Sequence, residues 1–233
     1  MSKVLPLPFR DYLARLNLLL VAYQSTKMVV KLRIIGRYLI CPFESFVGVF
    51  PSRGEILDVG CGDGLLLLLL TQDGNTGERK FRGIDHSEDK IAVANCLSIP
   101  NTSFGSEALE EIHDESYDCI SIVDVLYCVP LEKWREILRN CYRILRVGGR
   151  LIVKEVTNRP RWKYYLIYLE EVIAIKVLHI TRGALPHFES TDTYHSYLEQ
   201  TGFRCDHAHM LDAGHLHAHC LFLATKLESQ ENS

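Results

Sequence analysis

Between residues 55 and 157 the chain alternates short apolar runs with stretches in which apolar residues recur every three or four positions. Short apolar runs bounded by glycine or aspartate predict buried strands, and the longer recurrence predicts helices. Their regular alternation predicts a parallel sheet covered by helices, which is an α/β fold. The predicted strands are 56–59, 81–84, 117–123 and 150–156, and the predicted helices are 65–70, 89–97 and 131–146, the last stopped by Gly148-Gly149.

The segments outside this alternation have a different character. Residues 191–226 predict a helix over 191–201 and then an antiparallel hairpin with strands at 203–211 and 215–226. We therefore expect a single domain over 1–233 whose parts share one core. These parts are a helical cap (1–54), the core (55–157 and 191–226), a helical insertion rich in Tyr, Ile and Leu (158–190) and a polar tail (227–233).

The composition excludes several classes of protein. Of the 233 residues, 47% are hydrophobic and 24% are charged, which is the usual globular mixture and excludes a disordered chain or a coiled coil. The net charge of -3 argues against binding to nucleic acid through the whole surface. None of the eight cysteines forms a Cys-x-x-Cys pair, and every long apolar stretch contains charged residues. We expect a soluble cytoplasmic protein with reduced cysteines.

A glycine-rich turn after the first predicted strand is the most informative segment. The sequence from Ile56 to Gly64 delivers a strand into a turn with glycine at three alternating positions, so a ligand can approach the backbone closely. Asp85 follows about 20 residues later at the end of the next strand, where a nucleotide-binding unit places its acceptor for ribose hydroxyls. The alternative is a tight strand-to-helix turn that binds nothing.

The residues around this turn favour one kind of nucleotide. Leu65 stands where a dinucleotide-binding loop has its third glycine, and no Gly-Lys-Ser/Thr follows as in a P-loop. The carboxylates of Asp58 and Asp63 disfavour a pyrophosphate at the following helix. They suit a ligand that carries an amine and a sulfonium, which points to S-adenosylmethionine.

The same turn resembles motif I of the class I, Rossmann-like S-adenosylmethionine-dependent methyltransferases. Further segments resemble later motifs of this family in the correct order, namely Gly83-Ile84-Asp85, Ser106-Glu107-Ala108, Tyr117-Asp118 and the turn Leu145-Arg146-Val147-Gly148-Gly149. Val147 replaces the usual proline, Glu107 replaces the usual aspartate, and Tyr127-Cys128 replaces a frequent His-His pair. The segment containing Cys41-Pro42-Phe43-Glu44 is similar to bacterial members of the small-molecule and lipid type.

The resemblance implies a seven-stranded mixed sheet of the Rossmann-like kind and a set of cofactor contacts. Asp58 is expected near the amine of the methionine part, Asp85 at the ribose and Glu107 at the adenine edge, with His86 beside it. The full set implied for S-adenosylmethionine and its product S-adenosylhomocysteine is Asp58, Gly60, Cys61, Gly62, Asp85, His86, Glu107, Ala108 and Val123.

The resemblance implies methyl transfer to a small or lipid-like acceptor, more on oxygen than on nitrogen. Such an oxygen needs a general base, for which four side chains stay open as candidates: His187, Tyr194, His195 and Tyr127. The alternative function is a non-catalytic regulatory or scaffold protein that binds S-adenosylmethionine. A nicotinamide-dependent oxidoreductase is a third option, which Leu65 disfavours.

Two further patterns carry expectations. Cys205, His207 and His209 alternate, as do His215, His217 and His219; we interpret them as the polar face of a half-exposed hairpin and expect no metal site. Residues 162–169 are apolar on nearly every side, and residues 1–54 carry eight basic against two acidic residues. We expect these two segments to roof a hydrophobic substrate pocket. Peripheral contact with the inner membrane face and the oligomeric state stay open.

Overall fold

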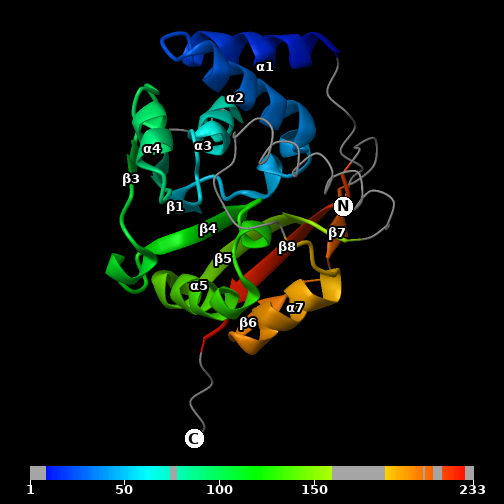
Figure 1. Ribbon diagram of the computed structural model, residues 1–233. Coiled ribbons are helices and arrows are strands. Elements are labelled where there is room, and N and C mark those ends of the chain that lie inside the picture. The colour runs from blue at the N-terminus through cyan, green and yellow to red at the C-terminus, as the bar shows by residue number, and fades with distance from the viewer. Residues whose placement is uncertain (1–8, 74–77, 159–186, 207, 212–216, 229–233) are drawn as a thin grey trace, which may run out of the picture. The chain divides into compact units, whose positions relative to one another are not determined.

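The computed structural model describes residues 9–73, 78–158, 187–206, 208–211 and 217–228 (Figure 1). It divides into two compact units, Met1–Ala108 and Leu109–Ser233. Most of the insertion predicted at 158–190, including residues 162–169, lies outside the described residues, as do residues 229–233 of the tail. The single domain over 1–233 therefore stays a prediction.

The first unit begins with two helices in mutual contact, α1 (Phe9–Ala22) and α2 (Met28–Ile40), as expected for the segment 1–54. Two short 3-10 turns follow, η1 (Phe43–Ser45) and η2 (Val47–Val49). Aromatic rings join these elements, because the ring of Tyr38 stacks on that of Phe43, and both side chains are buried. This buried aromatic contact packs α2 against the 3-10 turn η1.

Three parallel strands form the sheet of the first unit: β1 (Gly54–Val59), β2 (Arg79–Ile84) and β3 (Thr102–Gly105). The helices α3 (Leu65–Leu70) and α4 (Glu88–Ala94) follow β1 and β2, and the 3-10 turn η3 (Thr71–Asp73) ends α3. All six leucines of α3 are buried, so this helix has no polar face. β3 was not predicted, because its four residues are polar or only partly buried.

The second unit contains a mixed set of strands. β4 (Tyr117–Val123) pairs in parallel with β5 (Leu145–Val156), which pairs in antiparallel with β8 (His219–Lys226). β6 (Phe203–Cys205) and β7 (His209–Met210) also pair with β8 in antiparallel. The predicted reversal of the last strand is therefore present, although β8 begins later than the predicted residue 215.

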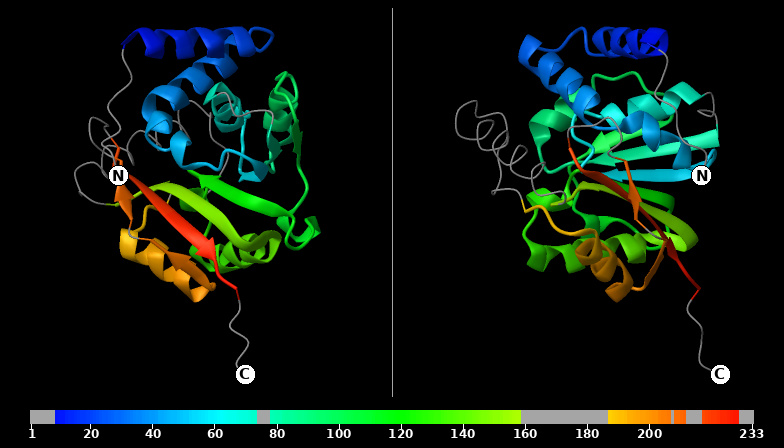
Figure 2. Two further views of the ribbon diagram at one scale, coloured as in Figure 1. Left: turned by 180° about the vertical axis from the view of Figure 1, so that it is seen from behind. Right: turned by 90° about the vertical axis from the view of Figure 1, so that its right-hand side faces the viewer.

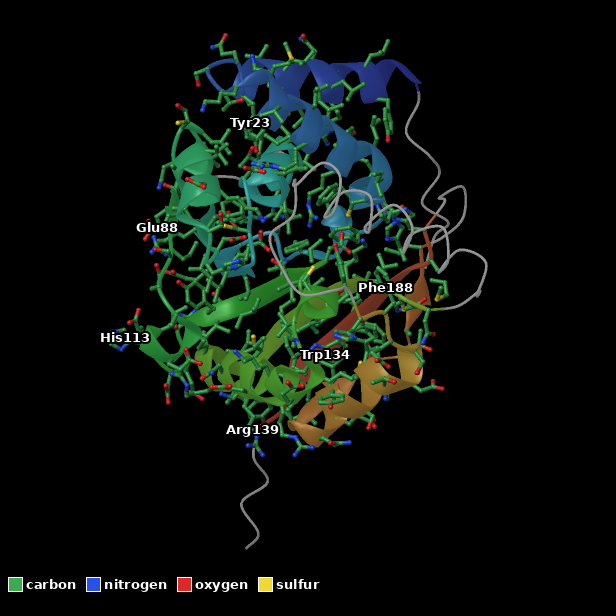
Figure 3. The ribbon with its side chains drawn as sticks, in the orientation of Figure 1. Tyr23, Glu88, His113, Trp134, Arg139 and Phe188 are labelled. Atoms are coloured by element: carbon green, nitrogen blue, oxygen red, sulfur yellow. The ribbon has the colours of Figure 1, made fainter. Side chains whose placement is uncertain are left out.

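The helices α5 (Leu131–Ile144) and α7 (Thr191–Gln200) lie on the same side of these strands in both views of Figure 2. Trp134 of α5, labelled in Figure 3, stacks on Tyr194 of α7 with ring centroids 4.7 Å apart. Ser190 caps α7, since its side chain accepts a hydrogen bond from Thr193 N–H. Two 3-10 turns complete the unit, η5 (Leu109–Glu111) and η6 (Leu126–Cys128).

The boundary between α5 and β5 differs from the prediction. The helix ends at Ile144 and the strand starts at once with Leu145, so Gly148 and Gly149 lie inside β5. A Cβ at Gly149 would stand 2.7 Å from the carbonyl oxygen of Arg146, and Gly148 has a φ of +76°. The two glycines therefore bend the strand at a shift in its register with β4, and they do not stop the helix.

The expected polar face of the terminal hairpin is wrong for His219, whose side chain is only 1% exposed. Most of β8 is buried on both faces, as in a central strand. His207 and His215 lie outside the described residues. Within the described ranges no three His, Cys, Asp or Glu side chains are grouped to hold a metal ion. No helix in the same ranges has the length and hydropathy to cross a bilayer.

Candidate functional site

The turn after β1 takes a backbone path that favours glycine. Gly60, Gly62 and Gly64 have φ angles of +74°, +56° and +82°, a region that other residues rarely adopt. At Gly62 the nearest atom to an added Cβ would be 4.0 Å away, on the side chain of Lys90. The backbone is therefore open to a ligand at Gly62.

Asp85 is fixed against this turn immediately after β2. Its Oδ2 accepts a hydrogen bond from Gly62 N–H at 3.0 Å, and its Oδ1 accepts one from Ser87 N–H at 2.9 Å. A carboxylate offers about four acceptor positions, so each oxygen of Asp85 retains capacity for a further donor. The neighbouring His86 has an almost fully exposed side chain, with Nδ1 at 3.5 Å from Asp85 Oδ1.

Two other predicted cofactor residues of the turn are buried. Asp58 lies near the end of β1 and is 2% exposed. Burial raises the pKa of the Cys61 thiol, and the carboxylates of Asp58 and Asp85 raise it further. Cys61 therefore stays a neutral thiol, which can contact a ligand but cannot offer it a negative charge.

Glu107 has a partner that the sequence did not indicate. Arg82 donates from Nε and Nη2 to the two carboxylate oxygens of Glu107, at 2.7 and 2.5 Å. A Cβ at Gly105 would stand 2.3 Å from both Arg82 Nη2 and Glu107 Oε2, so the ends of these two side chains would have to move to accommodate it. Each oxygen of Glu107 can still accept another hydrogen bond, and Ala108 next to it is exposed.

The charge of Asp63 requires a correction. This carboxylate was expected to add negative charge at the turn, but Arg33 of α2 donates to both of its oxygens, at 3.1 and 2.6 Å. In addition, the hydroxyl of the buried Tyr23 donates to the carbonyl oxygen of Asp63 at 2.8 Å. Tyr23 and Arg33 are thus contacts of the candidate site that the sequence did not indicate, because nothing in the local pattern connects them with a turn far along the chain.

In the second unit, the chain leaves β4 through a strained residue. Val123, predicted to line the cofactor with its backbone, is buried at the end of the strand. Asp124 follows with a φ of +56°, and its N–H donates to the carbonyl oxygen of Lys154 at 2.9 Å. The ammonium of Lys154 is fully buried and lies 2.6 Å from Asp124 Oδ1. This ion pair fixes the end of β4 to β5.

Glu155 anchors the same loop from the next position of β5. Its Oε1 accepts hydrogen bonds from Val125 N–H at 3.0 Å and from Leu126 N–H at 2.8 Å. Its Oε2 is buried and has no hydrogen-bond partner among the described residues. Burial raises the pKa of Glu155 to about 8, and the charge of Asp124 contributes. A sequence signal existed, since Lys154 and Glu155 are adjacent charges inside a strand predicted to be buried.

The structure brings two of the four candidate bases together. His187 N–H donates to the carbonyl oxygen of Tyr127 at 2.7 Å. The ring of Tyr127 stacks on that of Phe188, with centroids 5.2 Å apart, and both pack against the buried Val156. The side chain of His187 is exposed, and His187 directly precedes Phe188 of this apolar cluster in the chain.

The other two candidates lie in succession on α7 and have different surroundings. Tyr194 is buried, and its hydroxyl has no hydrogen-bond partner among the described residues. Burial raises the pKa of Tyr194, and the charges of Glu155, Glu189 and Asp124 raise it further, so this phenol stays protonated. His195 is about one third exposed, with Nδ1 at 3.4 Å from Glu199 Oε2 one helical turn later.

The residues of the first unit fit S-adenosylmethionine. Its ribose diol can donate to an acid that is already oriented, and the backbone at Gly62 leaves room for close approach. A buried carboxylate, Asp58, stands where the resemblance implies the ligand's amine. Asp58 and Asp85 thus offer acceptors and negative charge to the amine and the hydroxyls of a nucleoside that carries an amino acid.

Comparison with known proteins extends this assignment. A family model described as a methyltransferase domain matches residues 33–208, well over half of the chain. The ubiquinone biosynthesis O-methyltransferase of Pseudomonas fluorescens (strain SBW25) is 30% identical over 125 residues, covering 51% of each chain. The chain thus spans about half the length of the curated relatives it matches.

Solved structures show the same fold. A SAM-dependent methyltransferase from Methanosarcina mazei has a TM-score of 0.61 at 20% identity, covering 77% of this chain and 95% of its own. An S-adenosylmethionine-dependent methyltransferase from Mesorhizobium loti has a TM-score of 0.60 at 15% identity, covering 79% and 98%. The predicted Rossmann-like fold and the predicted cofactor class are confirmed. The chain belongs to the class I S-adenosylmethionine-dependent methyltransferase family.

Proposed function

We propose that this methyltransferase transfers the methyl group of S-adenosylmethionine to an oxygen atom of a small, lipid-like acceptor. Binding of the cofactor is supported above all by Asp85. Its two carboxylate oxygens are oriented by hydrogen bonds from the N–H groups of Gly62 and Ser87, beside a turn whose backbone is open. The acceptor half is supported by the matched relatives, which are named for O-methylation in ubiquinone biosynthesis.

The cofactor, when bound, supplies an electrophilic methyl group on a positively charged sulfur. Asp85 would accept hydrogen bonds from the ribose hydroxyls, and the buried carboxylate of Asp58 would pair with the amine of the methionine part. Glu107, oriented by Arg82, would accept from the adenine amino group. The chain's contribution is then to hold the methyl donor in position with little further rearrangement.

An acceptor hydroxyl must lose its proton as the methyl group is transferred. We assign this role to His187, because histidine is the commonest general base and its backbone is tied to Tyr127 just beyond β4. Tyr194 suits the role poorly, since its phenol is buried and its pKa is raised. The apolar cluster of Tyr127, Val156 and Phe188 beside His187 suits an acceptor with an aliphatic or aromatic body.

Two measurements test the proposal in sequence. Titration calorimetry with S-adenosylhomocysteine should show binding, and radiolabelled methyl transfer should then be measured to phenols with and without a prenyl chain, to carboxylic acids and to amines. We expect transfer to phenols, faster with the prenyl chain. Transfer to amines alone would overturn the assignment to oxygen, and binding without any turnover would favour the regulatory alternative.

The base is tested on the acceptor that gives turnover. His187→Ala should lower kcat by about 10²–10⁴-fold while leaving cofactor binding intact, as expected for loss of a general base. His113→Ala removes the same side chain from an exposed position after η5 and serves as the matched control. Equal losses in the two variants, or none in His187→Ala, would remove His187 from this role.

A further inference from the structure

Exposed apolar side chains are concentrated on the first two helices. Of the eleven large apolar side chains that are exposed within the described residues, eight lie on α1 and α2. The three outside these helices are Val147, Met210 and Leu227. Isolated exposed apolar residues are ordinary on a protein surface, but a group of eight on one helical pair is a patch that marks an interaction site. These eight are Leu13, Leu20, Val21, Met28, Val29, Leu32, Leu39 and Ile40.

On α2 these residues form a continuous stripe. Met28, Leu32 and Leu39 are 69%, 63% and 48% exposed, and their spacing of four and seven residues places them on one face of the helix. The opposite face holds Ile34 and Tyr38, which are buried against the first unit. α2 therefore has apolar side chains on two faces. Only the inner face packs in the core of the unit, and the outer face is exposed to solvent.

The charge around this stripe is of one sign. From residue 12 to residue 54 the chain has six basic residues and one acidic residue, Glu44. Glu44 accepts a hydrogen bond from Tyr38 and forms an ion pair with Arg15, and Arg33 is paired with Asp63. The excess positive charge of this segment therefore comes from its other four basic residues. Lys27 and Lys31 flank the start of the stripe at the first turn of α2. An exposed apolar face with a basic rim is the pattern of a helix that lies in a membrane interface.

We propose that the exposed apolar face of α1 and α2, with its rim of Lys27 and Lys31, docks onto the surface of an anionic lipid bilayer. A second copy of this chain suits the face less well, because a symmetric contact would bring the same positive rims together. Residues 159–186 carry five basic and two acidic residues, so their charge does not complement the rim either. Anionic headgroups supply the opposite charge, and the acyl region accepts the apolar stripe.

Flotation of the full chain with vesicles tests this proposal. We expect binding to vesicles of phosphatidylglycerol and phosphatidylcholine in equal parts, and little binding to phosphatidylcholine alone. Lys27→Ala/Lys31→Ala should lower the partition coefficient about 30-fold, from about fivefold per lysine, and 1 M salt should reduce the difference between the two vesicle types.

The apolar contribution is tested with Met28→Gln/Val29→Gln/Leu32→Gln, which retains helix-forming side chains on an exposed face. We expect at least about a tenfold loss of binding to the anionic vesicles. Val147→Gln removes an exposed apolar side chain from β5 in the second unit and should bind as the wild type does. Circular dichroism of each variant checks that the fold is retained.

Two flotation results would overturn the proposal: no flotation of the wild type with anionic vesicles, or unchanged flotation of the triple glutamine variant. It would also be overturned if the wild type bound no vesicles but formed a dimer and the triple glutamine variant were a monomer. The proposal deepens the lipid-like acceptor proposed above, but its test uses neither cofactor nor acceptor. Methyl transfer without vesicle binding would therefore overturn the docking face alone, and vesicle binding without transfer to oxygen would overturn the proposed function alone.

Discussion

Arg33 of α2 holds the carboxylate of Asp63 with two hydrogen bonds, at 3.1 and 2.6 Å. Asp63 belongs to the glycine turn, so this pair attaches the N-terminal helices to the candidate cofactor site within the first unit. The carboxylate of Asp63 is mostly buried, whereas one third of the Arg33 side chain is exposed. The pair is thus shielded enough to contribute more than an ordinary surface ion pair.

Removing Arg33 should therefore weaken the site as well as the fold. We expect Arg33→Ala to lower the free energy of unfolding by about 2 kcal/mol, since two hydrogen bonds to a charged group are lost. S-adenosylhomocysteine should bind about tenfold more weakly, because a turn with an unpaired Asp63 is less ordered before binding. Arg53→Ala removes the same charge from an exposed position and is the control. Urea denaturation and calorimetry measure both effects, and equal affinities in the two variants would contradict the link.

Asp85 should contribute more to the binding of S-adenosylhomocysteine than any side chain of the glycine turn. Asp85→Ala removes the acceptors of two ribose hydroxyls, so we expect a loss of about 100-fold in affinity for S-adenosylhomocysteine, at about 1.5 kcal/mol for each charged hydrogen bond. Asp85→Asn retains one acceptor oxygen and should lose less. Glu88→Ala, at an exposed residue of α4 labelled in Figure 3, makes the same charge change and should bind normally. Calorimetry compares the four proteins.

The two glycines Gly149 and Gly36 should respond in opposite directions to alanine. A methyl group at Gly149 would stand 2.7 Å from the backbone carbonyl oxygen of Arg146, so Gly149→Ala should destabilise the protein by about 1–3 kcal/mol. Gly36 lies in α2 with no atom within 4 Å of an added Cβ, so Gly36→Ala should stabilise it by about 0.5–1 kcal/mol. Thermal melts of the two variants decide this, and a decrease of Tm in both would be inconsistent with the described geometry.

The buried Glu155 predicts a pH dependence of stability. Its pKa is about 8 in the folded protein against 4.5 for an ordinary glutamate, so between these values the folded state holds a proton that the unfolded state releases. Stability from this group is complete below pH 4.5 and declines as the pH rises through 8. Glu155→Gln cannot titrate, so the wild type should lose stability relative to this variant from pH 5 to pH 9.

Glu155→Gln also retains an oxygen that can accept from Val125 and Leu126, so the loop after β4 should keep its anchor. Urea denaturation at several pH values provides the comparison. Glu199→Gln on the exposed side of α7 should follow the wild-type curve. A constant difference between wild type and Glu155→Gln across the range would mean that Glu155 is ionised in the folded protein at every pH tested.

Strong local patterns explain what could be predicted from the sequence. The strand β4 has the predicted bounds, because its short, mostly apolar run contains no glycine or proline and ends at Val123 before the charged Asp124. The glycine turn and Asp85 were found through spacing, and the structure places them in hydrogen-bond contact. The four-residue strand β3 was not predicted, because Thr102 and Ser103 interrupt any apolar run there.

The contacts of the charged residues could not be predicted in the same way. Arg33 and Asp63 are 30 residues apart, and Arg82 and Glu107 are 25 apart, so no periodicity along the chain connects either pair. The charge of Lys154 inside a buried strand did signal a partner, yet only the pairing of β4 with β5 identifies that partner as Asp124. Local propensity predicts elements, whereas ion pairs depend on which elements meet.

The six leucines of α3 have a consequence for how a cofactor is received. Unwinding this helix would expose all six side chains to water, at about 1.5–3 kcal/mol each, which approaches the whole free energy that holds a domain together. The hydrogen-bonded amides in the last turn of α3, such as that of Leu68, should therefore be among the slowest to exchange with deuterium. A nucleoside arriving at the glycine turn then meets a receptor that is rigid in advance, and little of its binding energy is spent on ordering the protein.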